Sequence, residues 1–317
     1  MHYELTHRTV YTYEHEVALS HHLVRLTPRE LPSQRCLSHA LEVVPHPVRA
    51  SPRTDYFGNP TELFVIEGAH REFAVTARSR VERLPRPDPP IDHALAWDEV
   101  RELCRGDRVT VALEACEFAF GSPQVPRRPA FAAYAAPSFP PGRPLCEAVL
   151  DLTRRIHREF KFDPKATTVS TPVDQVLREK RGVCQDFAHF EIACLRSLGL
   201  PARYVSGYLE TLPPPGKPKL VGADASHAWL AFFLPGSGWI DIDPTNNVLP
   251  DQRHITVAWG RDYQDVAPIR GVILSGGEHE LQVAVDVNPI PPVGEPAPLP
   301  DPTEPPAASA ASSEAGA

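Results

Sequence analysis

Residues 181–200 decide the fold and read RGVCQDFAHFEIACLRSLGL. From Cys184 onward this stretch is largely apolar with a helical pattern, and it ends at Gly199 before Pro201, as helices commonly do. A thiol in the first turn of a helix lies at the positive end of the helix dipole, beside N–H groups without partners, which favours the thiolate. The stretch therefore predicts a buried helix with a reactive cysteine at its N-terminus.

Two helices are expected before this stretch and a set of strands after it. Apolar residues spaced four, three, four and four apart predict one helix, which begins beside Pro144; these residues are Leu145, Val149, Leu152, Ile156 and Phe160. The second helix begins at Pro172 and ends at Gly182. Strand-like segments then cover residues 202–209, 227–233, 238–243, 255–258 and 280–287. Helices followed by antiparallel strands predict an α+β core.

The N-terminal part has a different pattern. Residues 3–13 alternate between apolar and polar side chains, and similar runs cover residues 22–27, 38–44, 61–67 and 72–83. No good helical pattern occurs before residue 92. Residues 1–84 are therefore predicted to form an all-β sandwich.

Proline marks the boundaries between the predicted units. The chain has 37 prolines among 317 residues, more than twice the average usage of about 5%. They concentrate in residues 85–90, 123–144 and 213–218 and from residue 289 onward. We predict a sandwich (1–84), a Pro-rich linker with a helical connection (85–143), a catalytic core (144–288) and a disordered tail (289–317).

Composition and motifs exclude several classes of function. The net charge is −8 and no basic run occurs, so nucleic acid is not an expected ligand. The longest apolar run is far shorter than the roughly 20 residues of a membrane span, and the N-terminus lacks the apolar segment of a signal peptide. Six scattered cysteines fit reduced thiols. We expect a soluble cytoplasmic protein without a membrane partner, and the oligomeric state stays open.

No motif for a metal or a nucleotide is present. The 14 histidines are dispersed and no His-Glu-x-x-His or Gly-rich phosphate loop occurs. We therefore expect neither a metal nor a cofactor.

Three residues together suggest nucleophilic catalysis. A cysteine enzyme needs a thiolate, a histidine that exchanges protons with it, and a carboxylate or amide that orients the histidine. Cys184, His227 and either Asp241 or Asp243 supply these types. A hairpin around residues 235–237 would bring His227 near the end of the next strand. Asp241 and Asp243 are two positions apart and share one face of that strand, so the alternation of side chains does not decide which of them contacts His227. Each residue alone is more often structural, whereas their combination favours a catalytic site.

The motifs GVCQDF, DASHAW and GWIDIDPTN resemble the core signatures of the bacterial transglutaminase-like proteins, members of the papain-like cysteine-enzyme superfamily. Residues 3–13, 27–29 and 55–59 look like the N-terminal β-domain that accompanies this core. The resemblance covers most of residues 1 to about 285, with residues 90–143 weakly matched. It implies an α+β protein whose papain-like or transglutaminase-like core packs a nucleophile-bearing helix on an antiparallel sheet.

The resemblance also implies a role for each residue. Cys184 would be the nucleophile, His227 the general base and acid, and Asp243, in its Asp-Pro-Thr context, the orienting carboxylate. Gln185 and Trp229 would line the substrate site. The implied activity is acyl transfer from an amide or ester carbonyl of a peptide or protein to an amine or to water, and these two acceptors stay open.

Two other classes of cysteine enzyme and one non-enzyme class are the alternatives to this activity. Papain-type proteases separate cysteine and histidine by roughly 130 residues, whereas here the separation is 43, so that sequence class is excluded. Arylamine acetyltransferases are a closer enzyme rival, but no pattern for their cofactor occurs. A catalytically silent protein-binding scaffold on the same fold is the non-enzyme alternative.

The loop at residues 210–223 is either a rim of the site or a plain surface loop.

Overall fold

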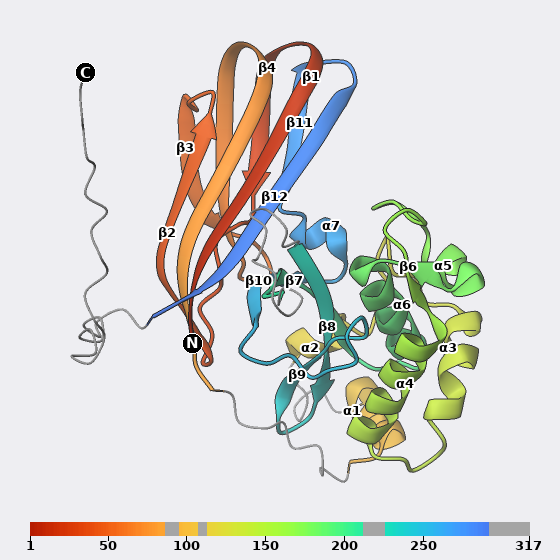
Figure 1. Ribbon diagram of the computed structural model, residues 1–317. Coiled ribbons are helices and arrows are strands. Elements are labelled where there is room, and N and C mark those ends of the chain that lie inside the picture. Colours follow the sequence, from red (N-terminus) through yellow and green to blue (C-terminus); the bar gives the residue numbers. More distant parts are fainter. Residues whose placement is uncertain (86–94, 107–112, 212–225, 292–317) are drawn as a thin grey trace, which may run out of the picture.

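The computed structural model describes residues 1–85, 95–106, 113–211 and 226–291 (Figure 1). Most of the loop predicted at residues 210–223, parts of the predicted linker, and the predicted tail from residue 292 lie outside these ranges. Among the described residues, no helix is both long and apolar enough to cross a bilayer.

The N-terminal sheet is built on two very long strands. β1 (His2–Val24) and β4 (Pro60–Arg83) are 23 and 24 residues long and pair antiparallel along most of their lengths. The first half of β1 and the last part of β4 are flanked by β12 (His279–Ile290) and β2 (Gln34–Val44). The other halves are flanked by β11 (Ile269–Ser275) and β3 (Arg49–Thr54). The six strands thus form two four-stranded halves that share β1 and β4.

The two halves of this sheet enclose one apolar core. Val43 and Val75 from one half cluster with Phe64 and Ile66 from the other. The contact is tightened where His22 stacks on Phe73 with ring centroids 3.8 Å apart. This packing agrees with the predicted β-sandwich.

The last two strands differ from the prediction. The predicted core extended to residue 288 and included a strand at residues 280–287, but β11 and β12 both pair with β1 in the N-terminal sheet. Without them β1 would be an exposed edge strand more than 20 residues long. Nothing in the local pattern of residues 269–290 shows which sheet they join, because alternation looks the same in either.

The predicted catalytic core contains a four-stranded antiparallel sheet in the order β10-β7-β8-β9. Its strands are β7 (Ala202–Leu209), β8 (Ser226–Leu234), β9 (Gly238–Ile242) and β10 (His254–Gly260). α6 (Cys184–Ser197) packs against β7 and β8, with α4 (Leu145–Glu159) and α5 (Val173–Glu179) beside it (Figure 1). The remaining elements are α1 (Trp97–Gly106), α2 (Leu113–Glu117), α3 (Pro129–Ala135), η1 (Ala136–Ser138), β5 (Lys161–Phe162), β6 (Arg181–Gly182) and α7 (Tyr263–Val266).

The N-terminal sheet and the core sheet pack against each other directly. Tyr3, Leu5 and Val287 belong to the same apolar cluster as the helices of the core. Between them, His7 Nδ1 lies 2.9 Å from the Tyr208 hydroxyl of β7. The two sheets therefore share one continuous interior.

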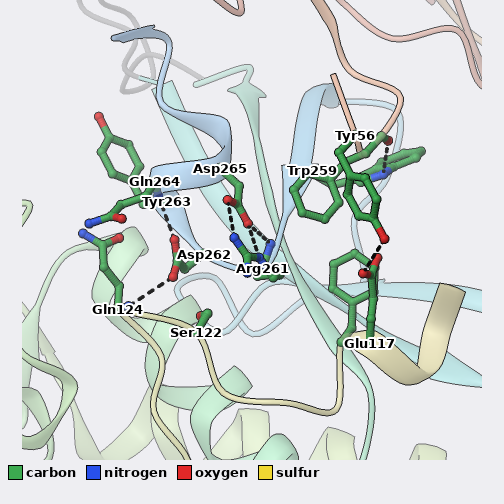
Figure 2. Close-up of polar contacts among 12 residues, drawn as sticks. Tyr56, Glu117, Ser122, Gln124, Trp259, Arg261, Asp262, Tyr263, Gln264 and Asp265 are labelled. Atoms are coloured by element: carbon green, nitrogen blue, oxygen red, sulfur yellow. Dashed lines mark hydrogen bonds and ion pairs between the residues drawn. The ribbon is translucent and has the colours of Figure 1, made fainter. Parts of the chain in front are cut away.

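Polar contacts join the turn between β3 and β4 to the end of β10 and to α2 (Figure 2). The Tyr56 hydroxyl donates to Glu117 Oε2 at 3.0 Å, and Trp259 Nε1 donates to the carbonyl of Phe57 at 3.1 Å. Beside them, Arg261 forms an ion pair of 2.8 Å with Asp265 of α7. These contacts fix the orientation of β10 relative to the N-terminal sheet.

A buried acid lies in the middle of α6. Glu191 is completely buried, and its Oε1 is 2.6 Å from Thr153 Oγ1, which is also 2.9 Å from the carbonyl oxygen of Val149. The Thr153 hydroxyl is the donor in both contacts, so its single proton is shared between the Glu191 carboxyl and the Val149 carbonyl. Burial, the largest cause, raises the pKa of Glu191 to about 8. Burial thus favours the neutral form of Glu191 near pH 7.

We expect Glu191→Gln to stabilise the protein, and to do so more at pH 8 than at pH 5. The native carboxyl holds its proton up to a higher pH than the unfolded one, so stability falls as the pH rises from about 4.5 toward about 8. Glutamine removes this loss, and a gain of about 1–3 kcal/mol at pH 8 is expected. Urea unfolding at both pH values measures it, with exposed Glu147→Gln as the control. Equal effects at both pH values would contradict the prediction.

Candidate active site

Cys184 is the first residue of α6, as the sequence predicts. The helix start is capped by Asp186, whose Oδ2 accepts from the Val183 N–H at 2.8 Å and from the Thr167 hydroxyl at 2.6 Å. Gly182 makes room for this cap, because a Cβ there would lie 2.5 Å from the same Oδ2. The Gly-Val-Cys-Gln-Asp sequence thus fixes where the helix begins and places the thiol in its first turn.

His227 and Asp243 come from the predicted hairpin. In the β8–β9 pairing, Ala231 lies opposite Asp241 and Phe233 opposite Trp239, so His227 and Asp241 share one face of the sheet. This register confirms the predicted alternation. Asp243 follows β9 and reaches His227 diagonally, with 2.7 Å between Asp243 Oδ2 and His227 Nε2.

The structure resolves the choice that alternation left open, because Asp243 and not Asp241 contacts His227. Asp243 is completely buried, and its Oδ1 accepts from the N–H groups of Thr245 (2.9 Å) and Asn246 (3.3 Å). Its Oδ2 also accepts from Asn246 Nδ2 at 2.7 Å and from His254 Nε2 at 3.3 Å. Burial alone would raise the pKa of Asp243, but the hydrogen bonds outweigh it and hold the pKa well below its usual range. Asp243 is therefore a buried carboxylate.

His227 links this carboxylate to the thiol. Its Nε2 is hydrogen-bonded to Asp243, which leaves Nδ1 as the ring nitrogen available for its interaction with Cys184. Burial alone would lower the pKa of His227, but the hydrogen bonds with Asp243 and Cys184 outweigh it and raise the pKa to about 10. The structure thus brings the three predicted residues together, and the raised pKa of His227 favours its protonated form beside the carboxylate.

Gln185 and Trp229 are both mostly buried, and the substrate contact expected of them stays a prediction. The Gln185 amide donates to the carbonyl of Val169 at 3.1 Å, and the residue is only 9% exposed. Trp229 is 1% exposed and packs edge-to-face on His254, with centroids 5.4 Å apart. In the structure Gln185 links the loop before α5 to the start of α6, and Trp229 packs against His254 from inside the sheet.

Sequence reasoning missed two residues that surround Asp243. Asn246 lies within the quoted motif GWIDIDPTN, so its position next to the aspartate could have been noticed. Nothing in the sequence indicated that His254 contacts the site, because a single histidine at the start of an apolar strand looks like any other packed residue.

The same side chains form the one metal-like grouping among the described residues. Donor atoms of His227, Asp243 and His254 all lie within 4.8 Å of one another. The hydrogen bonds of 2.7 and 3.3 Å to Asp243 Oδ2 account for their closeness without an ion.

Two family models match the chain. Residues 3–82 match the bacterial transglutaminase-like N-terminal region, and residues 134–244 match the transglutaminase-like superfamily. The second match includes Cys184, His227 and Asp243, and the first covers most of the N-terminal sheet.

Individual relatives agree with these matches. An uncharacterized protein of Mycobacterium bovis is 42% identical over 292 residues, which cover 90% of this chain and 92% of that protein. A protein-glutamine gamma-glutamyltransferase of Pseudomonas aeruginosa is 33% identical over 130 residues, 35% of this chain and 20% of that protein.

A solved structure shares the fold. The crystal structure of a candidate cysteine protease from Cytophaga hutchinsonii aligns with a TM-score of 0.73 at 20% identity, over 92% of each chain. This likeness concerns the fold alone. Together with the matched motifs and the M. bovis relative, it leads to one conclusion: the chain belongs to the transglutaminase-like superfamily, among the bacterial members that carry the transglutaminase-like N-terminal region.

Proposed function

We propose that the protein is a thiol-dependent acyl-transfer enzyme that acts on amide carbonyls of peptides or proteins through an acyl-enzyme on Cys184. One observation carries this proposal: His227 is hydrogen-bonded to the buried Asp243 at 2.7 Å and lies close enough to Cys184 for the two side chains to interact electrostatically. A thiol paired with a histidine that a buried carboxylate orients is the arrangement of a cysteine nucleophile.

The reaction follows from these contacts. The Cys184 thiolate attacks the carbonyl carbon and a C–S bond forms, while the oxygen takes up negative charge near the N–H groups at the start of α6. The C–N bond then breaks and the His227 imidazolium gives its proton to the leaving amine. In the second half, His227 takes a proton from the acceptor as it attacks the thioester, and the thiolate leaves. Asp243 holds the ring and stays ionised throughout.

An amine and water can both act as the acceptor in this scheme. The name of the P. aeruginosa relative supports an amine, because a glutamyltransferase passes its acyl group to an acceptor other than water. Product analysis with a glutamine-containing peptide, with and without an added primary amine, distinguishes transamidation from hydrolysis. A cytoplasmic location and the lack of nucleic-acid and membrane partners stay predictions.

Thiol alkylation tests the proposal against the silent scaffold. At pH 6 we expect iodoacetamide to modify Cys184 well before the other cysteines, because only Cys184 is paired with an imidazolium. Burial raises the pKa of Cys104 to about 12 and of Cys146 to about 11, which keeps these thiols protonated. Peptide mass spectrometry over time measures the order of labelling. Slow and uniform labelling of all six cysteines would refute an active nucleophile.

A further inference from the structure

We infer that His254 is a positioning residue of this site and that the N-terminal sheet holds it in place through β10. The inference rests on the proposed function, because it concerns how the thiol and its histidine are aligned. It assigns a role to the N-terminal sheet that neither the motifs nor the comparisons provide.

His254 presents a fixed donor to Asp243. Its side chain is almost fully buried, and its Nε2 is 3.3 Å from Asp243 Oδ2. An ionised carboxylate only accepts hydrogen bonds, so His254 Nε2 carries the proton in this contact. Its Nδ1 lies 3.3 Å from the backbone N and from Oδ1 of Asp251, and Trp229 packs on the ring. The ring is thus held at both nitrogens and on its surface.

This donor acts on His227 through the shared carboxylate. Asp243 Oδ2 accepts from both His227 Nε2 and His254 Nε2. When His254 fixes the position of this oxygen, His227 is kept with Nε2 on Asp243 and with Nδ1 toward Cys184. That orientation lets the imidazole exchange a proton with the thiol.

The position of His254 depends on β10, whose outer edge is held by two side-chain amides of the N-terminal sheet region. Gln34 Nε2 donates to the Thr256 carbonyl at 2.7 Å, and its Oε1 accepts from the Thr256 N–H at 2.9 Å. Asn59 Nδ2 donates to the Trp259 carbonyl at 2.8 Å, and its Oδ1 accepts from the Trp259 N–H at 3.0 Å. We call Gln34 and Asn59 the amide clamp.

The amide clamp takes the place of a neighbouring strand. Each amide offers one donor and one acceptor to a single residue, which is how a hydrogen-bonded residue pair joins two antiparallel strands. Gln34 and Asn59 are both completely buried. The opposite edge of β10 pairs with β7, and His254 is the first residue of β10, two positions before Thr256. Loosening the clamp therefore allows the strand that carries His254 to shift.

The test compares His254→Leu with His254→Gln in the full chain. Leucine fills the space without a donor, whereas glutamine keeps an N–H near the position of Nε2. At pH 6 we expect His254→Leu to slow alkylation of Cys184 by roughly tenfold or more, the effect of one hydrogen bond to a charged group. His254→Gln should stay within about threefold of the unmodified protein. Equal slowing by both variants would indicate a packing role and overturn the inference.

Substitutions of Gln34, which lies in the N-terminal sheet region and not beside the thiol, test the role of the amide clamp. Gln34→Met removes both hydrogen bonds to Thr256, and a second variant, Gln34→Glu, keeps the acceptor and removes the amide donor. Both are expected to slow alkylation of Cys184 in the same direction as His254→Leu, while Gln282→Met, on an exposed position of β12, leaves it unchanged. Folded Gln34 variants that label at the full rate would overturn the assigned role of the N-terminal sheet.

Histidine-selective ¹⁵N NMR separates this inference from the proposed function. We expect the His227 Nε2–H resonance in the unmodified protein and in His254→Gln, and its broadening or loss in His254→Leu. If His254→Leu leaves the His227 ring signals unchanged, His254 does not position it. If the ring signals respond as expected but Cys184 labels no faster than the other thiols, the inference stands and the proposed enzyme activity fails.

Discussion

Replacing Cys184 by alanine should abolish formation of a covalent acyl-enzyme with an activated ester and leave the fold intact. The thiol is only partly buried and lies at a helix start, where alanine fits the backbone and leaves no deep cavity. Nothing else in the proposed scheme forms the C–S bond, so the rate should fall by about 10⁴-fold or more. Intact-protein mass spectrometry after incubation with a nitrophenyl ester detects the acyl group directly.

Cys36→Ala is the matched control for this experiment. Cys36 is also partly buried, but it lies in β2 of the N-terminal sheet. This variant should form the acyl-enzyme at the full rate, and both variants should unfold within about 1 kcal/mol of the unmodified protein. Covalent acylation that persists in Cys184→Ala would show that another side chain is the nucleophile.

Asp243→Asn should reduce acyl transfer by roughly 10⁴-fold, the scale known for losing the orienting carboxylate of such a triad. Burial by itself lowers the pKa of His227, and the hydrogen bond that His227 donates to Asp243 is the foremost cause that opposes it. Without the carboxylate, His227 loses its proton at a lower pH, and the imidazolium that pairs with Cys184 is no longer retained near neutral pH. Single-turnover acylation measured from pH 5 to 9 tests both the rate and the shift in its pH profile.

Asp241→Asn provides the control within the same motif. Asp241 lies on the same face of the sheet but opposite Ala231 on β8. Its substitution should change the rate by no more than about threefold, because the contact to His227 is made by Asp243. Similar losses in both variants would show that the effect comes from general damage to β9 rather than from the triad.

Much of the site follows from local rules of sequence. The Gly-Val-Cys-Gln-Asp stretch contains its own helix cap, so the position of Cys184 in the first turn could be predicted. The short turn at residues 235–237 and the alternation around it likewise predicted which face of the hairpin carries His227. Such rules depend only on residues a few positions apart, so they can be applied without knowing the tertiary structure.

Other features depend on contacts between distant parts of the chain. Alternation could not separate Asp241 from Asp243, because two residues two positions apart on a strand point the same way. The burial of Trp229 and the hydrogen bond of Gln185 to Val169 also depend on neighbours that the local pattern does not name.

The sequence by itself determined a cysteine at a helix start, a hairpin that carries a histidine and two candidate acids, and an N-terminal unit made of strands. Only the tertiary structure decided that β11 and β12 return to β1, that His254 reaches Asp243, and that Gln34 holds β10 from 222 residues away. The physical reason is that helix caps and strand alternation arise from neighbouring residues. A strand edge or a buried hydrogen-bond donor, in contrast, pairs with a group from a distant part of the chain. Which group this is depends on how the whole chain packs.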